Sequence, residues 1–335
     1  MLVFSVESSC DETSVCIMQN DKKILSHIVY SQEIHKKHGG VVPELASRAH
    51  LEILQNITKK AFKDSGLKLS DIDLFSATCG PGLIGGLLIG STFTKSLAIG
   101  LQKPFIPINH LEAHVLSTFF NNKITFPHLC LLITGGHTQI YLLKDLKTIK
   151  LIGETIDDAV GEAFDKVAKI LGLSYPGGHE IEKKAIHGDE NTFKLPQPLT
   201  KENNLNFSFS GIKTSINLLS KKNIIDDNFI KNISASFQKC VANILIKKLN
   251  KAITNIESDK NNKLSTSVVG GVANNKYLKK CFESLEIKND IKILYPPEFM
   301  MSDNAAMIAW ATILKYSKIN DLDFRPNPRL AISLS

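Results

Sequence analysis

Two well-separated stretches of the sequence share one pattern, and this repeat constrains the fold more than any other feature. Residues 2–18 (LVFSVESSCDETSVCIM) and 129–143 (LCLLITGGHTQIYLL) each contain an apolar run, a short polar turn and a second apolar run. This pattern is typical of a strand, a tight loop and a strand. Because helix-like segments follow both, the sequence predicts a duplicated α/β unit whose halves face each other across a cleft. The alternative is coincidence, since short apolar runs are common in any α/β protein.

The other segments fit an alternation of strands and helices. Periodicity and turn residues predict, in chain order, a helix over Val42–Lys63, a strand over Asp73–Cys79, a helix over Ile89–Leu101 after the turn GPGLIGG, a loop over Leu195–Asn206, a loop over Ser258–Ser265, a strand over Thr266–Val269 and a helix from about Asn274. Strands that alternate with helices are typical of the α/β class.

The composition is that of an ordinary folded protein. Of 335 residues, 43% are hydrophobic and 22% are charged, which excludes disordered, collagen-like and coiled-coil classes. The net charge of +7 suits a polyanionic partner without requiring one, because the lysines are scattered. Six cysteines without C-x-x-C spacing are expected to be free thiols in a reducing compartment. The N-terminus lacks a signal-peptide pattern and Leu83–Gly90 is too short to span a bilayer, so we expect a cytoplasmic protein.

Two histidines stand four residues apart in the segment NHLEAHVL, which is a plausible helix start. Helical geometry brings His110 and His114 to one face, where they could chelate one zinc or iron ion. The alternative is that both are ordinary polar helix residues. Leu111 follows the first histidine where metalloproteases have the general-base glutamate, and Glu112 comes one position later, which argues against proteolysis of that type. Asp303 precedes an apolar helix and could be its N-cap or a third metal ligand.

Glycine turns follow two of the predicted strands. The segments Thr134–Thr138 and Gly270–Asn275 would let backbone N–H groups approach a phosphate or sugar, with favourable dipole from the next helix. Neither is a P-loop, because no Gly-Lys-Ser/Thr follows. The alternative is that both are simple turns.

Acidic residues gather in two further places. Asp158, Glu162 and Asp165 are spaced to share a helix face that could hold ribose hydroxyls or a hydrated cation. Alternatively, Thr155 to Asp158 forms a capping box and the carboxylates stabilise the helix dipole. Glu7, Asp11 and Glu12 belong to the first hairpin turn, where they could orient a nucleophile or a cation, although acids also favour turns.

Nine motifs in one order make the chain similar to a known family. They are ESSCDETSV, GGVVPELASR, GPGLIGGLLIG, HLEAH, ITGGHTQ, GETIDDAVGEAFDKVAKILGLSYPGG, FSFSGIKTS, GGVANN and SDNAAMIA. This set resembles the bacterial TsaD family of tRNA N6-adenosine threonylcarbamoyltransferases nearly from end to end. The resemblance implies an actin-like ATPase fold of the acetate-kinase and sugar-kinase type, with two duplicated α/β domains flanking a central cleft. We expect these domains at residues 1–115 and 116–304, with a helix from about 305 to 335 packing back onto the first.

The resemblance also implies the site residues. His110, His114 and Asp303 would bind one iron or zinc ion. The threonylcarbamoyl-adenylate substrate, or ATP or ADP in the same cleft, would be bound by Leu132, Ile133, Thr134, Gly135, Gly136, Asp165, Gly178 and Asn275. Asp11 and Glu12 match acidic positions implicated in the family's catalysis.

The implied reaction transfers the threonylcarbamoyl group from its adenylate to N6 of the adenosine beside the anticodon, in tRNAs that read codons beginning with A. A metal that polarises the carbamoyl carbonyl or neutralises the adjacent phosphate would help a weakly nucleophilic amine to attack. Asp11 or Glu12 could accept the proton released from N6. The implied partners are tRNA, TsaB-like and TsaE-like proteins, and a TsaC-type enzyme that supplies the substrate.

Three positions depart from the family pattern, among them Asn274, which stands where a small residue is commoner, and three other functions remain open. His179 stands where proline is usual, and His38 stands where an aromatic residue often precedes the glycines. Alternative functions are an ATPase or small-molecule kinase of the same fold, a glycoprotein endopeptidase and a non-catalytic scaffold. The kinase would turn over ATP without tRNA, whereas the displaced glutamate argues against the peptidase and the intact motifs argue against a pure scaffold.

Overall fold

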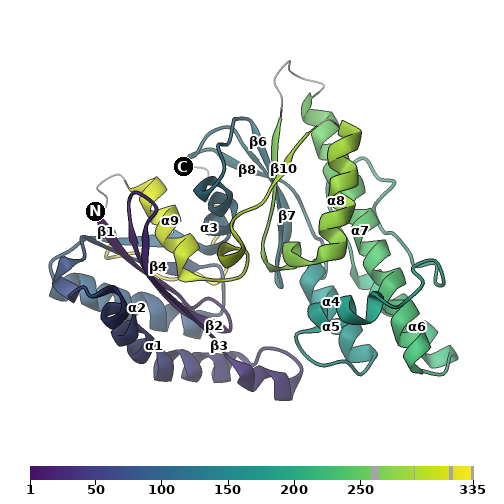
Figure 1. Ribbon diagram of the computed structural model, residues 1–335, viewed down its shortest axis with the longest axis horizontal. Helices are drawn as coiled ribbons and strands as arrows, with labels where there is room; N and C mark the ends of the chain where they lie inside the picture. Colours follow the sequence, from purple (N-terminus) through teal and green to yellow (C-terminus); the bar gives the residue numbers. More distant parts are fainter. Residues whose placement is uncertain (258–263, 290, 317–319, 333–335) are drawn as a thin grey trace. The chain divides into compact units, whose positions relative to one another are not determined.

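The computed structural model describes residues 1–257, 264–289, 291–316 and 320–332. These residues divide into two compact units (Figure 1). Unit 1 comprises Met1–Asn121 together with the described residues from Pro296 onward, and unit 2 comprises Asn122–Tyr295. Residues 116–121 and 296–304, which the sequence analysis placed in the second domain, therefore group with unit 1.

Unit 1 is built on a five-stranded sheet in the order β3-β2-β1-β4-β5. The strands are β1 Leu2–Glu7, β2 Glu12–Gln19, β3 Ile24–Ser31, β4 Leu74–Gly80 and β5 Phe105–Asn109. The helices are α1 Pro43–Ser65, α2 Ile84–Gly100, α3 His110–Ser117 and α9 Ala305–Lys315. Figure 1 shows α1 and α2 on one face of this sheet and α3 and α9 on the other. Apolar layers on both faces explain why every residue of β4 is buried.

Unit 2 repeats this plan. Its sheet has the order β10-β9-β6-β7-β8, in which β6 pairs with β7 antiparallel and with β9 parallel, as β1 pairs with β2 and β4. The strands are β6 His128–Ile133, β7 Thr138–Leu143, β8 Ile149–Glu154, β9 Ser265–Val269 and β10 Ile293–Leu294. The helices are α4 Val160–Ile170, α5 Gly177–Ala185, α6 Ser210–Lys222, α7 Asp227–Glu257 and α8 Lys276–Asn289. The duplicated α/β unit predicted from the two hairpins is confirmed.

Most predicted elements are present, and α2 differs in an informative way. It begins at Ile84, five residues before the predicted start, so Gly85 and Gly86 lie inside its first turn. A Cβ at Gly86 would lie 2.2 Å from the carbonyl oxygen of Ser8, and one at Gly85 would lie 2.0 Å from Oγ of Ser47. These glycines therefore allow close helix packing rather than a loop.

The remaining expectations have mixed outcomes. The C-terminal helix was expected to reach about residue 335, but α9 ends at Lys315 and residues 320–332 form turns and irregular chain. Leu195–Asn206 is irregular as predicted, whereas residues 258–263 of the second predicted loop lie outside the described residues. The six cysteines are free thiols, as expected. Among the described residues, no helix is both long and apolar enough to cross a membrane.

Candidate functional site

Helix α3 carries both histidines of the predicted metal site. It begins at His110, where the side chain of Asn109 accepts a hydrogen bond from the Glu112 amide at 3.1 Å and forms the N-cap. The four-residue spacing brings the rings of His110 and His114 to 4.8 Å between centroids, at 89° to each other. Both side chains are buried. Two imidazoles held in this way are suited to a shared ligand rather than to solvent.

Asp303 lies beside the two histidines although it is 189 residues away from His114 in the sequence. The N-cap of α9 is Asn304, whose side chain accepts from the Met307 amide at 3.0 Å, so the N-cap alternative for Asp303 is wrong. Its Oδ1 lies 3.0 Å from Nε2 of His114 and 3.5 Å from Nε2 of His110. The three side chains form a cluster whose candidate ligand atoms lie within 4.8 Å of one another.

These distances fit a metal ion. Ligands that surround zinc tetrahedrally at roughly 2.0–2.1 Å lie about 3.3 Å from one another, close to the spacing between Asp303 and each histidine. Burial by itself would raise the pKa of Asp303, but the neighbouring histidines hold it well below its usual range. The carboxyl group is therefore ionised, as a metal ligand must be.

The first hairpin turn, which carries Asp11 and Glu12, belongs to unit 1 as well. His50 of α1 holds this turn, because its Nε2 lies 3.0 Å from the Cys10 carbonyl oxygen and its Nδ1 lies 2.7 Å from Oγ1 of Thr13. Burial raises the pKa of Glu12 well above its usual value, and the charges of Asp11 and Asp303 raise it further. Glu12 is thus close enough to Asp11 and to Asp303 of the histidine–aspartate cluster to interact with them electrostatically.

The glycine turns of unit 2 lie side by side, because β6 and β9 are parallel neighbours with Leu132 opposite Val269. Gly270 has a φ of +97°, and a Cβ there would lie 2.5 Å from the Ile133 carbonyl oxygen. By contrast, Gly135 and Gly136 are exposed and have no neighbouring atom within 4 Å of an added Cβ. Since Leu132 and Ile133 are buried strand residues, the accessible part of this segment is its glycine turn.

The N-terminus of α4 is closed by that same turn. The amide of Val160 donates to Oγ1 of Thr138 at 2.8 Å, and those of Gly161 and Glu162 donate to the carbonyls of Thr134 and Gly135 at 3.3 and 3.0 Å. These three N–H groups are therefore occupied within the protein. The dipole of this helix stabilises the turn and its bonded N–H groups are not available to a phosphate.

Asp165 and Gly178 lie close together. Oδ1 of Asp165 accepts a hydrogen bond from the Gly177 amide at 2.7 Å, at the first residue of α5. Gly178 is the next residue, and it has open space where a side chain would be. His179 follows in the same helical turn and is exposed. A helix start with an adjacent carboxylate and an open glycine is compatible with a ligand that carries hydroxyl groups.

Asn275 has a structural role. Its amide nitrogen donates to Oε1 of Gln238 at 2.9 Å, and its oxygen accepts from the Leu278 amide at 2.9 Å in the first turn of α8. Only 8% of the residue is exposed. Asn274, its neighbour, is exposed. The side chain of Asn275 therefore shapes the glycine turn through internal hydrogen bonds.

The predicted acidic helix face is divided. Helix α4 begins at Val160, so Asp158 lies before it, and the capping box is wrong because the N-cap is Ala159. Nζ of Lys166 pairs with Asp158 at 2.7 Å and with Glu162 at 2.8 Å. A single lysine thus forms ion pairs with two of the three acids. Of the three, only Asp165 remains a candidate for ligand binding.

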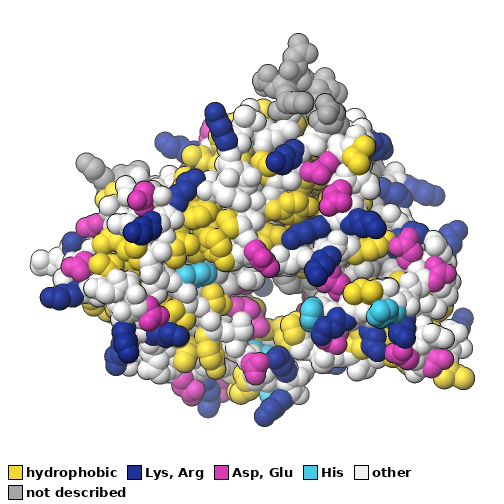
Figure 2. Space-filling view, in the orientation of Figure 1, with side chains coloured by type: hydrophobic (Ala, Val, Ile, Leu, Met, Phe, Trp, Pro, Cys, Tyr) yellow, Lys and Arg dark blue, Asp and Glu magenta, His cyan; other side chains and the backbone are white. Residues whose placement is uncertain are grey.

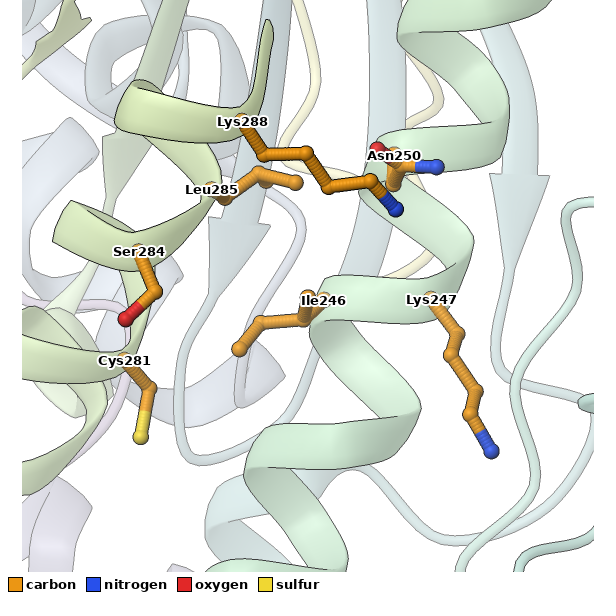
Figure 3. A pocket seen from close by; sticks show the side chains of 7 residues that line it. All are labelled: Ile246, Lys247, Asn250, Cys281, Ser284, Leu285 and Lys288. Carbon is orange, nitrogen blue, oxygen red and sulfur yellow. The ribbon is translucent and has the colours of Figure 1, made fainter.

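Two surface features do not belong to the site. A hollow of about 200 Å³ between α7 and α8 is lined by residues such as Ile246, Cys281 and Lys288 (Figure 3), and contains none of the predicted site residues. On the face shown in Figure 2, Lys and Arg side chains are interspersed with Asp and Glu rather than gathered into one patch. On this face, the distribution of charge alone therefore does not locate a binding surface.

Comparison with known proteins shows which family the chain belongs to. A sequence model of the TsaD family, described as tRNA N6-adenosine threonylcarbamoyltransferase, matches residues 23–310. The chain belongs to the TsaD family. It is 46% identical over 330 residues to the protein named tRNA N6-adenosine threonylcarbamoyltransferase from Wolbachia pipientis wMel, covering 98% of this chain and 97% of the relative. A relative of the same name from Rickettsia rickettsii (strain Sheila Smith) is 46% identical over 336 residues, covering 98% of both chains.

Solved structures support the fold expected of a TsaD protein. The activator of 2-hydroxyisocaproyl-CoA dehydratase from Clostridium difficile aligns with a TM-score of 0.52 at 16% identity, covering 95% of this chain and 97% of that one. Full-length HypF aligns with a TM-score of 0.59 at 14% identity, covering 94% of this chain and 47% of that one. At such identities the likeness shows the fold alone. It confirms the actin-like ATPase fold of duplicated α/β domains.

The sequence analysis named Glu7 among the acids of the first hairpin but did not predict its contact with His110. Glu7 ends the apolar strand β1 and is completely buried, with Oε2 3.1 Å from Nδ1 of His110. A carboxylate at the end of a buried apolar strand needs polar partners, and this requirement was the available signal.

Proposed function

We propose that this chain transfers the threonylcarbamoyl group from threonylcarbamoyl-AMP to N6 of the adenosine adjacent to the anticodon, in tRNAs that read codons beginning with A. The family match over residues 23–310 and the nearly full-length relatives of that name support the reaction. The convergence of His110, His114 and Asp303 from distant parts of the sequence is the structural observation that carries the proposal.

We propose that these three side chains hold one Fe²⁺ or Zn²⁺ ion. Two imidazole nitrogens and one carboxylate oxygen are a usual donor set for a catalytic metal with an open position. When bound, the ion would polarise the carbamoyl carbonyl or neutralise the adjacent phosphate. The burial of both histidines supports a defined ligand geometry, since neither ring is free to turn into solvent.

Asp11 and Glu12 are the proposed acceptors of the proton that N6 releases. The raised pKa of Glu12 supports this role, because burial and the neighbouring acidic charges make its carboxylate a stronger base than an ordinary one. His50 contacts the Cys10 carbonyl before these residues and the Thr13 hydroxyl after them, and so limits their movement.

In unit 2, we propose that the turn Thr134–Gly136, Asp165 and Gly178 bind the adenylate, or ATP or ADP at the same place, with the buried Leu132 and Ile133 supporting the turn from below. Asn275 would contribute indirectly, by fixing the neighbouring turn. The open space at Gly135, Gly136 and Gly178 supports close approach of a ligand to the backbone.

The proposed partners are tRNA, TsaB-like and TsaE-like proteins, and a TsaC-type enzyme that makes the adenylate, all in the cytoplasm. The net charge of +7 is compatible with binding tRNA through its phosphates, with affinity that falls as salt concentration rises.

An in vitro transfer assay tests the reaction. The purified chain, its partner proteins, threonylcarbamoyl-AMP and unmodified tRNA are incubated, and the digested nucleosides are analysed by mass. We expect modified adenosine from the wild type and none from Asp303→Ala or from the double variant His110→Ala/His114→Ala. His38→Ala removes an exposed histidine outside the site and should retain activity.

Two results would contradict the proposal. Full activity of Asp303→Ala would refute the metal assignment while leaving the reaction intact. No product from a folded, metal-loaded wild type beside a working control enzyme would refute the reaction, and rapid ATP hydrolysis without tRNA would then favour a kinase or ATPase.

A further inference from the structure

The side of His110 that faces away from Asp303 is occupied by a buried carboxylate. Glu7 is the last residue of β1 and has no exposed surface. Its Oε1 accepts a hydrogen bond from the Ser9 amide at 2.6 Å, and its Oε2 accepts one from the hydroxyl of Thr78 at 2.5 Å. Thr78 belongs to β4, the parallel neighbour of β1. Two hydrogen bonds therefore hold the carboxylate in place independently of its contact with His110.

The third contact of Glu7 determines where the proton of His110 lies. Oε2 is 3.1 Å from Nδ1 of His110, and Oγ of Ser9 is 3.3 Å from the same nitrogen. An ionised carboxylate only accepts hydrogen bonds, so Nδ1 must be the donor. In the neutral imidazole the other nitrogen then has a free lone pair. That nitrogen is Nε2, the atom that lies 3.5 Å from Asp303.

The second histidine lacks this support. Nδ1 of His114 is buried, and among the described residues it has no hydrogen-bond partner. Its Nε2 contacts Asp303 at 3.0 Å. The two proposed ligands are thus unequal: Asp303 contacts Nε2 of both rings, but only His110 also has a carboxylate at Nδ1.

We propose that Glu7 is a positioning residue that holds His110 with its proton on Nδ1 and so presents Nε2 to the metal. This inference rests on the proposed metal site and extends it. A carboxylate behind a metal-binding histidine fixes the ring orientation and makes the coordinating nitrogen a stronger donor. Glu7 need not touch substrate or metal to have this effect.

The substitution Glu7→Gln tests the hydrogen bonds with almost no change of shape. If the glutamine oxygen takes the place of Oε2, its NH₂ group faces the amide of Ser9. If the NH₂ group takes the place of Oε2, it faces Nδ1–H of His110. Each orientation brings two donors together, and the second is relieved only when His110 moves its proton to Nε2, which blocks coordination.

The first readout is the position of the His110 proton, measured by long-range ¹H–¹⁵N NMR of the metal-free protein at pH values where the imidazole is neutral. We expect protonated Nδ1 in the wild type, and a shift toward protonated Nε2 in Glu7→Gln. The second readout is Zn²⁺ affinity from chelator competition. Removal of such a partner typically weakens metal binding about 10–100-fold, which is the loss we expect.

Thr78→Val is the matched control, because it removes another hydrogen bond to the same carboxylate oxygen but leaves the charge beside His110. It should keep Nδ1 protonated and bind Zn²⁺ far more tightly than Glu7→Gln. Equal losses in the two variants would mean that packing, rather than the carboxylate, supports the site, and would overturn the proposal.

Failure of this inference can be told apart from failure of the metal site. Wild-type protein with protonated Nε2 on His110, or Glu7→Gln with unchanged Zn²⁺ affinity, would refute the role of Glu7 alone. Zn²⁺ binding that is insensitive to His114→Ala would refute the metal site, and the wild-type NMR measurement would still decide the tautomer. That measurement needs no variant, so it holds even if Glu7→Gln does not fold.

Discussion

His128 couples the stability of unit 2 to pH. It is the first residue of β6 and is fully buried, with Nδ1 2.9 Å from Oγ of Ser265 and Nε2 2.8 Å from Oγ of Ser267. Burial lowers the pKa of its imidazole to about 4. In the unfolded chain, a histidine titrates near 6.5. Because the unfolded state binds the proton first as pH falls, acid favours unfolding, and the loss of stability begins near pH 6.5.

The size of this effect follows from the two pKa values. With a pKa of about 6.5 in the unfolded state and about 4 in the folded state, His128 lowers the free energy of unfolding by roughly 2 kcal/mol at pH 5 and by only about 0.2 kcal/mol at pH 7. The free energy of unfolding should therefore fall by about 2 kcal/mol between pH 7 and pH 5 through this side chain alone. Below pH 4 the contribution levels off at about 3 kcal/mol, because both states are then protonated.

Hydrogen exchange of peptides from β6 and β9, corrected for the intrinsic effect of pH, measures this loss locally. Between pH 7 and pH 5, the opening free energy obtained from exchange should fall by about 2 kcal/mol less in His128→Asn than in the wild type. This difference does not depend on how stable the variant is at pH 7. His179→Asn removes an exposed histidine of unit 2 and is the control. An equal pH dependence in wild type and His128→Asn, or an NMR titration of His128 near pH 6.5, would refute the reasoning.

Three further outcomes are expected. Gly270→Ala places a side chain at a φ of +97° and 2.5 Å from the Ile133 carbonyl, and should lower the protection of β9 by about 2 kcal/mol or more, whereas Gly271→Ala has open space and should cost much less. Asn304→Ala removes the N-cap of α9 and should destabilise unit 1 by about 1 kcal/mol in urea unfolding followed by fluorescence of Trp310. A chelator should abolish transfer activity, and added Zn²⁺ or Fe²⁺ should restore it; unchanged activity after verified metal removal would contradict the metal site.

Local patterns were sufficient for the elements that their own residues determine. The two hairpins alternate apolar runs with short polar turns, so their strands were predictable from sequence. Helix α3 was predictable because Asn109 is a good N-cap and the histidines follow at helical spacing. In these segments the hydrogen bonds that define the element connect residues close in sequence.

Elements that depend on distant contacts were less predictable. Gly85 and Gly86 are typical of a turn, yet they lie in α2 because Ser8 and Ser47 approach too closely for any side chain. The start of α4 was misplaced because the Thr138 hydroxyl and the carbonyls of Thr134 and Gly135, rather than Thr155, accept hydrogen bonds from its first amides. The residues of a segment do not show which distant strand or turn will pack against it, so these features could not be predicted from the local sequence.

The two units share one strand order, but the residues at their first hairpin turns differ. The β1–β2 turn contains Asp11 and is flanked by Glu7, the last residue of β1, and Glu12, the first residue of β2, whereas the corresponding β6–β7 turn contains Gly135 and Gly136. Carboxylates offer acceptors, which suit a histidine, a cation or a departing proton. Glycines expose the backbone, which suits close approach of a ligand. Since both turns are held by the same strand pairing, the side chains can differ while the backbone plan is retained, and the residue types in each turn, more than the fold, indicate its function.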